Sequence, residues 1–150
     1  MPISWPDPKA ISKVPHKRQH VVCKVVSVYD GDTFKALVPI GDAFLKLAIR
    51  VNGIDSPEVR ARRNNALAPL EKQAALAVRD RVAELLDQQE TVICPLAWDK
   101  YGGRLLADCW LPSGESLSEW LLQRGLVKAY HGARKQPWTQ AELEAIIKAS

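Results

Sequence analysis

The sequence lacks long apolar runs and has few histidines, and each shortage excludes a class of protein. No stretch approaches the roughly 20 apolar residues of a membrane-spanning helix, and residues 1–20 contain no segment resembling a secretory signal. We therefore expect no membrane association and an intracellular location, although a trimmed signal peptide would leave the same sequence. The three histidines, His16, His20 and His131, are too scattered to predict a histidine metal site.

Cysteine is also scarce, which argues against a disulfide framework. Cys23, Cys94 and Cys109 are odd in number, lie in apolar strand-like runs and match no zinc-binding spacing. We expect three reduced thiols in the core.

The positive charge is concentrated at one end of the chain. The net charge is +4, and residues 1–20 carry four basic residues against one aspartate, which is +3 of that total. Four prolines in the same segment predict a flexible basic arm, whereas residues 21–150 have the composition of one globular domain. Because this domain is nearly neutral, attraction to phosphate would depend on the arm and on local clusters such as Arg60, Arg62 and Arg63.

Five segments have the β-branched, alternating pattern of strands. They span residues 21–28, 33–39, 44–51, 91–96 and 104–111. In the third segment, alternation predicts that Leu45, Leu47, Ile49 and Val51 face the core and that Arg50 lies on the opposite face. The first three segments are joined by short turns and therefore predict a meander.

Three further segments predict helices. An apolar stripe of three-to-four spacing covers residues 69–87, a short helix covers residues 116–124 before Gly125, and Thr139 with Glu142 forms a capping box that opens the last helix. Five short antiparallel strands with a helix between the third and fourth favour a partly open barrel over a sandwich. The predicted fold class is α+β, mainly β, with a five-stranded OB-type barrel and three helices.

Three polar motifs lie on the predicted loops, and each has an ordinary structural explanation when taken alone. Asp-Gly between strands is a common hairpin signal, a Pro-Glu pair suits the start of a helix, and a strand arginine is often solvated. The motifs are Tyr29-Asp30-Gly31-Asp32-Thr33, Arg50-Val51-Asn52-Gly53-Ile54-Asp55-Ser56-Pro57-Glu58 and Asp99-Lys100-Tyr101-Gly102-Gly103-Arg104.

Together the three motifs match a chemical need. Cleaving a phosphodiester requires that charge on the phosphoryl oxygens be neutralised, that a water be oriented and that its proton be removed. Carboxylates, arginines and a glutamate on loops of one small barrel can supply these functions.

In their order and spacing the motifs resemble the staphylococcal nuclease (thermonuclease) family, over roughly residues 21–130. The resemblance implies a Ca²⁺-dependent endonuclease that cuts single-stranded or melted DNA and RNA and leaves 3′-phosphates. It implies that Asp32 and Asp55 bind Ca²⁺ through their carboxylates and Ser56 through its backbone carbonyl, a ligand set that suits a hard cation.

The resemblance also implies the remaining roles. Glu58 matches the general base, and Arg50 and Arg104 match the arginines that hold the phosphate. The substrate-binding positions implied are Lys100, Tyr101 and Tyr130, although Tyr130 fits a position at the edge of the core equally well. An extra glycine before Arg104 departs from the family pattern and could turn that side chain away.

Two alternatives to the enzyme stay open from the sequence. One is a catalytically silent nuclease-like module that binds nucleic acid or serves as a scaffold, and the other is an OB-type single-strand binder. The retained acids argue against the first, and the neutral body argues against the second. We expect a monomer whose partners are DNA and RNA.

Overall fold

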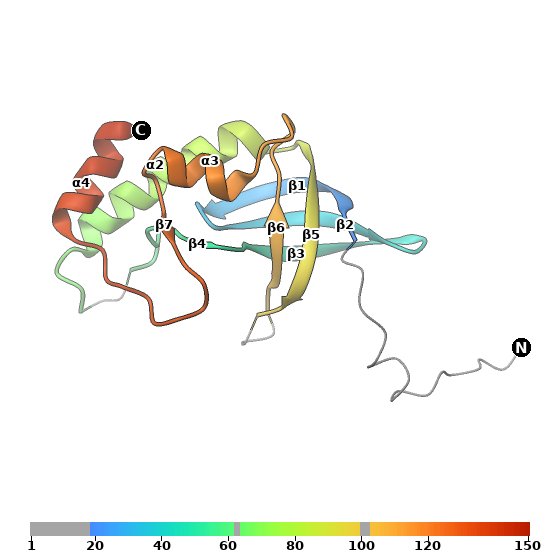
Figure 1. Cartoon of the computed structure of the whole chain (residues 1–150), viewed down its shortest axis with the longest axis horizontal. Coiled ribbons are helices and arrows are strands. Elements are labelled where there is room, and N and C mark those ends of the chain that lie inside the picture. Colours follow the sequence, from blue (N-terminus) through green and yellow to red (C-terminus); the bar gives the residue numbers. More distant parts are fainter. Residues whose placement is uncertain (1–18, 62–63, 100–102) are drawn as a thin grey trace, which may run out of the picture.

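The computed structural model describes residues 19–61, 64–99 and 103–150. A barrel of strands lies at one end of the molecule and the helices gather at the other (Figure 1). The strands are β1 (Val21–Asp30), β2 (Thr33–Ile40), β3 (Ala43–Val51), β4 (Ile54–Asp55), β5 (Glu90–Trp98), β6 (Leu105–Cys109) and β7 (Lys128–Ala129). The predicted arm falls almost entirely outside the described residues, as do Arg62, Arg63, Lys100 and Tyr101.

Five strands close into a barrel in the order β1-β2-β3-β6-β5, which confirms the predicted class of fold. Two details of the prediction were wrong. The barrel is closed rather than partly open, because residues 21–24 of β1 pair with residues 90–93 of β5. The strands are not all antiparallel, since β3 and β6 pair in parallel through Ile49–Leu105 and its neighbours. A parallel pair needs a long crossover, which α2 and β5 supply here.

The barrel interior is filled by alternate residues of its strands. The fully buried members include Val25, Phe34, Ala36, Ile49, Val51, Ile93 and Ala107. On β3 the predicted alternation holds at Ile49 and Val51 but not at Leu45, which is 47% exposed. The β2–β3 hairpin extends beyond the rest of the barrel (Figure 1), so its outer end has no opposite wall to pack against.

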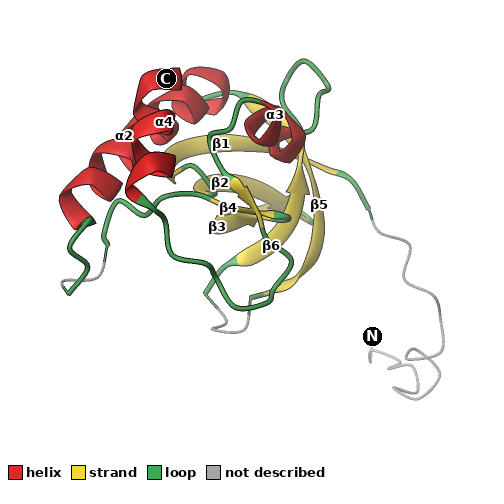
Figure 2. Cartoon of the chain, turned by 60° about the vertical axis from the view of Figure 1, so that its left-hand side comes forward, coloured by secondary structure: helices red, strands yellow, loops and turns green. Residues whose placement is uncertain are grey.

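The described residues form three helices, the number predicted, and these lie at one end of the barrel (Figure 2). They are α2 (Ala68–Leu86), α3 (Leu117–Gln123) and α4 (Gln140–Ala149). The Thr139 hydroxyl oxygen accepts a hydrogen bond from the backbone N–H of Glu142, so the predicted N-cap of the last helix is present. The Ser116 hydroxyl oxygen likewise accepts from the Glu119 N–H and caps α3, which was not predicted. The apolar stripe of α2, which includes Val78 and Val82, is buried in the core.

The three cysteines are buried, unbridged thiols, as predicted. Burial raises the pKa of Cys23 to about 11, which keeps that thiol protonated and unreactive. None of the described helices is long and apolar enough to cross a membrane.

A two-stranded sheet that the sequence did not predict leads from the barrel toward the helices. Ile54 of β4 pairs with Ala129 of β7, and Asp55 pairs with Lys128. The backbone N–H of Tyr130 also donates to the Gly53 carbonyl at 2.9 Å. This pairing fixes Asp55, one of the predicted metal ligands, and the two residues before it.

Candidate functional site

The site is built around the tight turn between β1 and β2. Asp32 follows Gly31 in this turn and is 5% exposed. Its Oδ1 accepts a hydrogen bond from the Thr33 hydroxyl at 2.9 Å, and its Oδ2 accepts one from the Ser56 backbone N–H at 2.9 Å. Its backbone carbonyl accepts from the Val51 N–H at 2.8 Å. Asp32 is therefore held by β2, β3 and the segment after β4.

Gly31 allows this turn to approach the rest of the site. A Cβ atom at Gly31 would lie 2.5 Å from Val78 Cγ1 and 2.9 Å from Ser56 Cβ, both far inside van der Waals contact. The turn, the α2 helix and Ser56 therefore meet at a point where only glycine fits.

Arg50 is buried beside Asp32. The β2–β3 register sets Thr33 opposite Arg50, and the guanidinium Nη2 lies 3.4 Å from Asp32 Oδ2. Nη1 donates to the Val51 carbonyl at 2.8 Å. Alternation correctly predicted that Arg50 lies on the face opposite the barrel core. A solvated arginine, the ordinary explanation of this residue, is excluded, because only 6% of it is exposed.

Asp55 lies at the end of β4 and contributes a second buried carboxylate, 6% exposed. Its buried Oδ1 accepts no hydrogen bond from any described residue. The only cation near that oxygen among the described residues is Lys135, whose Nζ lies 3.1 Å away in an ionic contact. Since Ser56 follows Asp55 and bonds to Asp32, the two carboxylates belong to one site.

Glu58 lies at the open side of the same site. Its side chain is 50% exposed, and its Oε1 lies 3.7 Å from Lys135 Nζ. The carboxylate therefore has access to solvent, as a group that activates a water needs.

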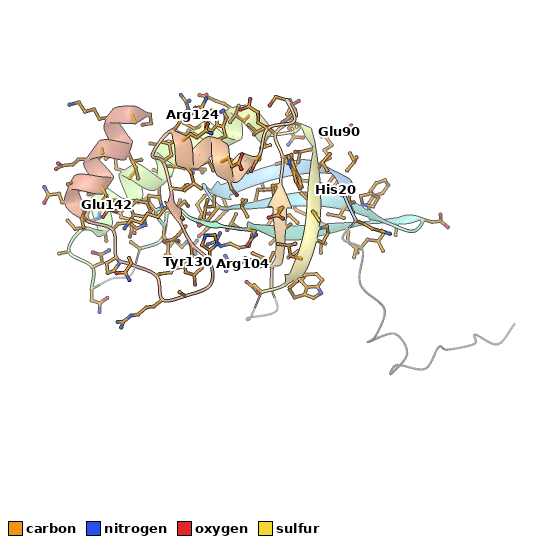
Figure 3. The ribbon with its side chains drawn as sticks, in the orientation of Figure 1. His20, Glu90, Arg104, Arg124, Tyr130 and Glu142 are labelled. Carbon is orange, nitrogen blue, oxygen red and sulfur yellow. The ribbon has the colours of Figure 1, made fainter. Side chains whose placement is uncertain are left out.

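The structure places Arg104 at the site despite the extra glycine. Its Nη1 lies 3.5 Å from Thr33 Oγ1, and that hydroxyl donates to Asp32. Its Nε donates to Asp99 Oδ2 at 2.7 Å, and this ion pair lowers the pKa of Asp99. The Arg104 side chain is 37% exposed, so part of its guanidinium stays available to a ligand. Figure 3 labels Arg104 and Tyr130 on the side of the barrel that β7 approaches.

Of the predicted substrate-binding residues, only Tyr130 can be located. It is half-buried just after β7, and Lys135 Nζ lies 5.7 Å from the centroid of its ring. Lys100 and Tyr101 lie outside the described residues.

Three charged residues at the site were not identified from the sequence as site residues. Asp30 is 8% exposed, and its Oδ1 accepts from the Asp32 N–H at 3.3 Å. Glu71, in the first turn of α2, is buried and lies near Glu58 and Asp55. Lys135 lies in the loop before α4. Asp30 could have been noticed in the Asp-Gly-Asp motif, but Glu71 and Lys135 reach the site only through the fold.

Burial and neighbouring charges shift the pKa values of these acids in different directions. Burial, with the nearby Asp32 charge, raises the pKa of Asp30 to about 8, so this carboxyl holds its proton at neutral pH. Burial opposes ionisation of Asp32 as well, but Arg50 and hydrogen bonds to its carboxylate hold the pKa of Asp32 below its usual value. Burial and then the Glu58 charge raise the pKa of Glu71. Two adjacent aspartates thus have opposite protonation preferences.

The side chains of the predicted metal ligands supply only part of the coordination shell of a hard cation. Among the described residues, no three His, Cys, Asp or Glu side chains are arranged as a metal site. The predicted set is smaller, two carboxylates and the Ser56 carbonyl. The buried Asp55 Oδ1 accepts no hydrogen bond from the described residues and is contacted only by the Lys135 ammonium, and a carboxylate oxygen of this kind is one that Ca²⁺ binds. Carboxylate oxygens also have spare lone pairs, so the bonds to Asp32 do not block a cation.

The comparison with family models matches residues 48–149 to the description "Staphylococcal nuclease homologue". The match covers more than half of the sequence. The chain belongs to this family. Members of this family are generally nuclease hydrolases. The matched segment contains Arg50, Asp55, Glu58 and Arg104 and begins after Asp32. No curated protein matches the chain.

Proposed function

We propose that this nuclease homologue is a Ca²⁺-dependent endonuclease. It hydrolyses phosphodiester bonds in single-stranded or locally melted DNA and RNA and leaves 3′-phosphate ends. The observation that carries the proposal is the pair of buried carboxylates, Asp32 and Asp55, joined through Ser56 beside the buried Arg50. A protein that only binds phosphate gains nothing from buried acids, because negatively charged carboxylates repel the phosphate.

Asp32, Asp55 and the Ser56 carbonyl would hold the cation. When bound, Ca²⁺ supplies positive charge next to the phosphoryl oxygens and a site at which water is acidified. Asp32 lies on the β1–β2 turn and Asp55 at the end of β4, which are both fixed by backbone pairing, and Ser56 follows β4 and is held by its bond to Asp32. Such fixed ligands need little rearrangement to receive a cation.

Glu58 would accept the proton of the attacking water. Its side chain is half exposed and lies on the same side of the site as the Asp55 carboxylate, since Lys135 contacts both acids. A carboxylate in this position removes a proton that the water must lose as it attacks phosphorus.

Arg50 on β3 and Arg104 just before β6 would bind the phosphate. Arg50 is held by Asp32 and the Val51 carbonyl, whereas Arg104 is held by Asp99 and Thr33. Their guanidinium groups offer paired donors to the phosphoryl oxygens as charge develops there. Tyr130, beside Lys135, would contact the nucleotide. Lys100 and Tyr101 stay predicted substrate-binding residues.

Cleavage assays with single-stranded DNA and RNA test the proposal. We expect cutting in Ca²⁺, none in chelator, and products that end in 3′-phosphate. Glu58→Gln should lower the rate by about 10²–10⁴-fold, the usual contribution of a positioned acid–base group. Because Glu58 is half exposed, this variant should keep its fold and its nucleic-acid binding.

Glu144→Gln is the matched control, since it removes an exposed carboxylate of α4 that pairs only with Gln140 among the described residues. Its rate should equal that of the unsubstituted protein. Binding without cleavage in Ca²⁺ and in every other divalent cation tried would favour the alternative, a catalytically silent module that binds nucleic acid or serves as a scaffold.

A further inference from the structure

Lys135 contacts a carboxylate oxygen that the proposed metal ion would need. The loop that carries it connects β7 to α4 and crosses the side of the molecule where β4 and β7 pair (Figure 1). Its ammonium lies 3.1 Å from Asp55 Oδ1 and 3.7 Å from Glu58 Oε1. One flexible cation therefore bridges a predicted metal ligand and the predicted general base.

The contact with Asp55 differs from an ordinary surface ion pair. The Asp55 side chain is 8% exposed, and its Oδ1 accepts no hydrogen bond from the described residues. A buried carboxylate without a partner is strongly destabilising, so Lys135 provides the charge compensation that the oxygen otherwise lacks. Arg50 cannot provide it as directly, because its guanidinium is held by Asp32 and the Val51 carbonyl.

Lysine is also a cation that can leave. Its side chain is 45% exposed, on a loop outside the helices and strands. Its ammonium is a point charge on a flexible stem and lacks the rigid paired donors of arginine. A Ca²⁺ ion bound to Asp55 would lie about 2.3–2.6 Å from the ligating oxygen and would repel an ammonium at that oxygen.

We propose that Lys135 is a tethered counter-ion, which neutralises Asp55 in the metal-free protein and is displaced from this carboxylate when Ca²⁺ binds. The inference rests on the proposed function, because it takes Asp55 as a metal ligand. The exchange stabilises the metal-free site and weakens Ca²⁺ binding by the free energy needed to displace the lysine. The released ammonium stays near the ring of Tyr130, on the side where substrate would bind.

Calorimetric titration of the full chain with Ca²⁺ alone, without nucleic acid, tests the exchange. Lys135→Gln should bind Ca²⁺ about tenfold more tightly than the unsubstituted protein, equivalent to about 1.4 kcal/mol. Arg134→Gln is the matched control, because it removes the same charge from an exposed neighbour that makes no ion pair with a described residue. Its affinity should change by less than about threefold. Lys135→Arg, which keeps the charge, should not bind Ca²⁺ more tightly than the unsubstituted protein.

Thermal unfolding gives a second measurement. In chelator, Lys135→Gln should melt at a lower temperature than Arg134→Gln, since Asp55 loses its counter-ion. Saturating Ca²⁺ should then raise the melting temperature of Lys135→Gln by more than that of the unsubstituted protein. If Lys135→Gln is too unstable to titrate in chelator, the size of this shift decides the question, and equal shifts contradict the proposal.

The calorimetric outcomes separate the two proposals. Ca²⁺ binding that is equally tight in Lys135→Gln and Arg134→Gln overturns the role of Lys135 and leaves the nuclease proposal intact. No Ca²⁺ binding by any of the four proteins overturns both.

Discussion

The site has a buried half and an open half, which are stabilised in different ways. The buried half consists of Asp30, Asp32, Arg50, Asp55 and Ser56, each at most 8% exposed. The open half consists of Glu58, Arg104 and Lys135, whose side chains are 37–50% exposed. Most of the buried residues lie on strands or on the β1–β2 turn, and Ser56 directly follows β4, whereas Glu58 and Lys135 lie on loops.

This difference predicts which substitutions lower stability and which lower activity. In the buried half, Asp32 is bonded to Arg50 and Ser56, so removing one group leaves another without its partner. In the open half, water can replace a partner lost from Glu58 or Arg104, so variants of these two residues should lower activity more than stability. Lys135 is the exception, because its partner Asp55 is buried.

The largest effect on stability is expected from Arg50→Met. This change keeps the apolar part of the side chain but leaves Asp32 buried without its cation, which should lower the free energy of unfolding by about 3–5 kcal/mol. Urea denaturation in chelator measures it. The control is Arg79→Met, which breaks an exposed ion pair with Asp80 on α2 and should cost less than about 1 kcal/mol. Equal losses in the two variants would remove the distinction between the halves.

Gly31→Ala tests the packing beneath the buried half. The new methyl group would overlap Val78 and Ser56, so the turn must move. The free energy of unfolding should fall by about 1–3 kcal/mol. Gly103→Ala is the control, because a Cβ there meets no atom within 4 Å. Both variants are measured by thermal and urea unfolding. A stable Gly31→Ala variant would show that the turn is not closely packed.

Arg104→Lys tests the open half. A lysine cannot reproduce the simultaneous contacts with Asp99 and Thr33 or the paired donation to phosphate, so the cleavage rate should fall about tenfold or more, nearly as far as in Arg104→Ala. The free energy of unfolding should change by less than about 1 kcal/mol. Full activity in the lysine variant would show that Arg104 does not bind the phosphate.

The last effect concerns the pH dependence of stability. The pKa of Asp30 is raised by burial and by Asp32 to about 8, so the folded protein holds a proton that the unfolded chain releases above about pH 4. Stability from this group is present at low pH and is lost as pH rises toward 8. Asp30→Asn should therefore stabilise the metal-free protein at pH 7–8 and flatten its pH dependence above pH 5.

Urea unfolding from pH 5 to 8 in chelator measures this effect. Asp42→Asn, at an exposed turn between β2 and β3, is the control and should leave the curve unchanged. A steeper loss of stability with pH in Asp30→Asn would contradict the assignment.

The fold was largely predictable from local patterns. Alternation and capping residues located the five barrel strands and three helices, since each is set by its own sequence. β4 and β7 could not be predicted, because two residues show no periodicity and their pairing joins segments far apart in the chain. Closure of the barrel and the parallel β3–β6 pair likewise depend on contacts between distant strands.

The site was predictable where residues follow a motif. Asp32, Arg50 and Asp55 lie in short segments with recognisable spacing, and the structure brings them into one buried half. The predicted roles of these residues, and those of Ser56, Glu58, Arg104 and Tyr130, stay predictions. Lys135 and Glu71 were missed because nothing in their local sequence distinguishes a lysine or glutamate near a site from one in solvent.

Asp32, Asp55 and the Ser56 carbonyl are proposed to hold one divalent cation together. A crystal structure of the protein grown with Ca²⁺, with the ion located by its anomalous scattering, would show whether they do. We expect a single ion bound by these three groups beside Arg50, with the Lys135 ammonium moved away from Asp55. An ion bound elsewhere, or Lys135 still in contact with Asp55 at saturating Ca²⁺ and no ion between the carboxylates, would contradict this proposal.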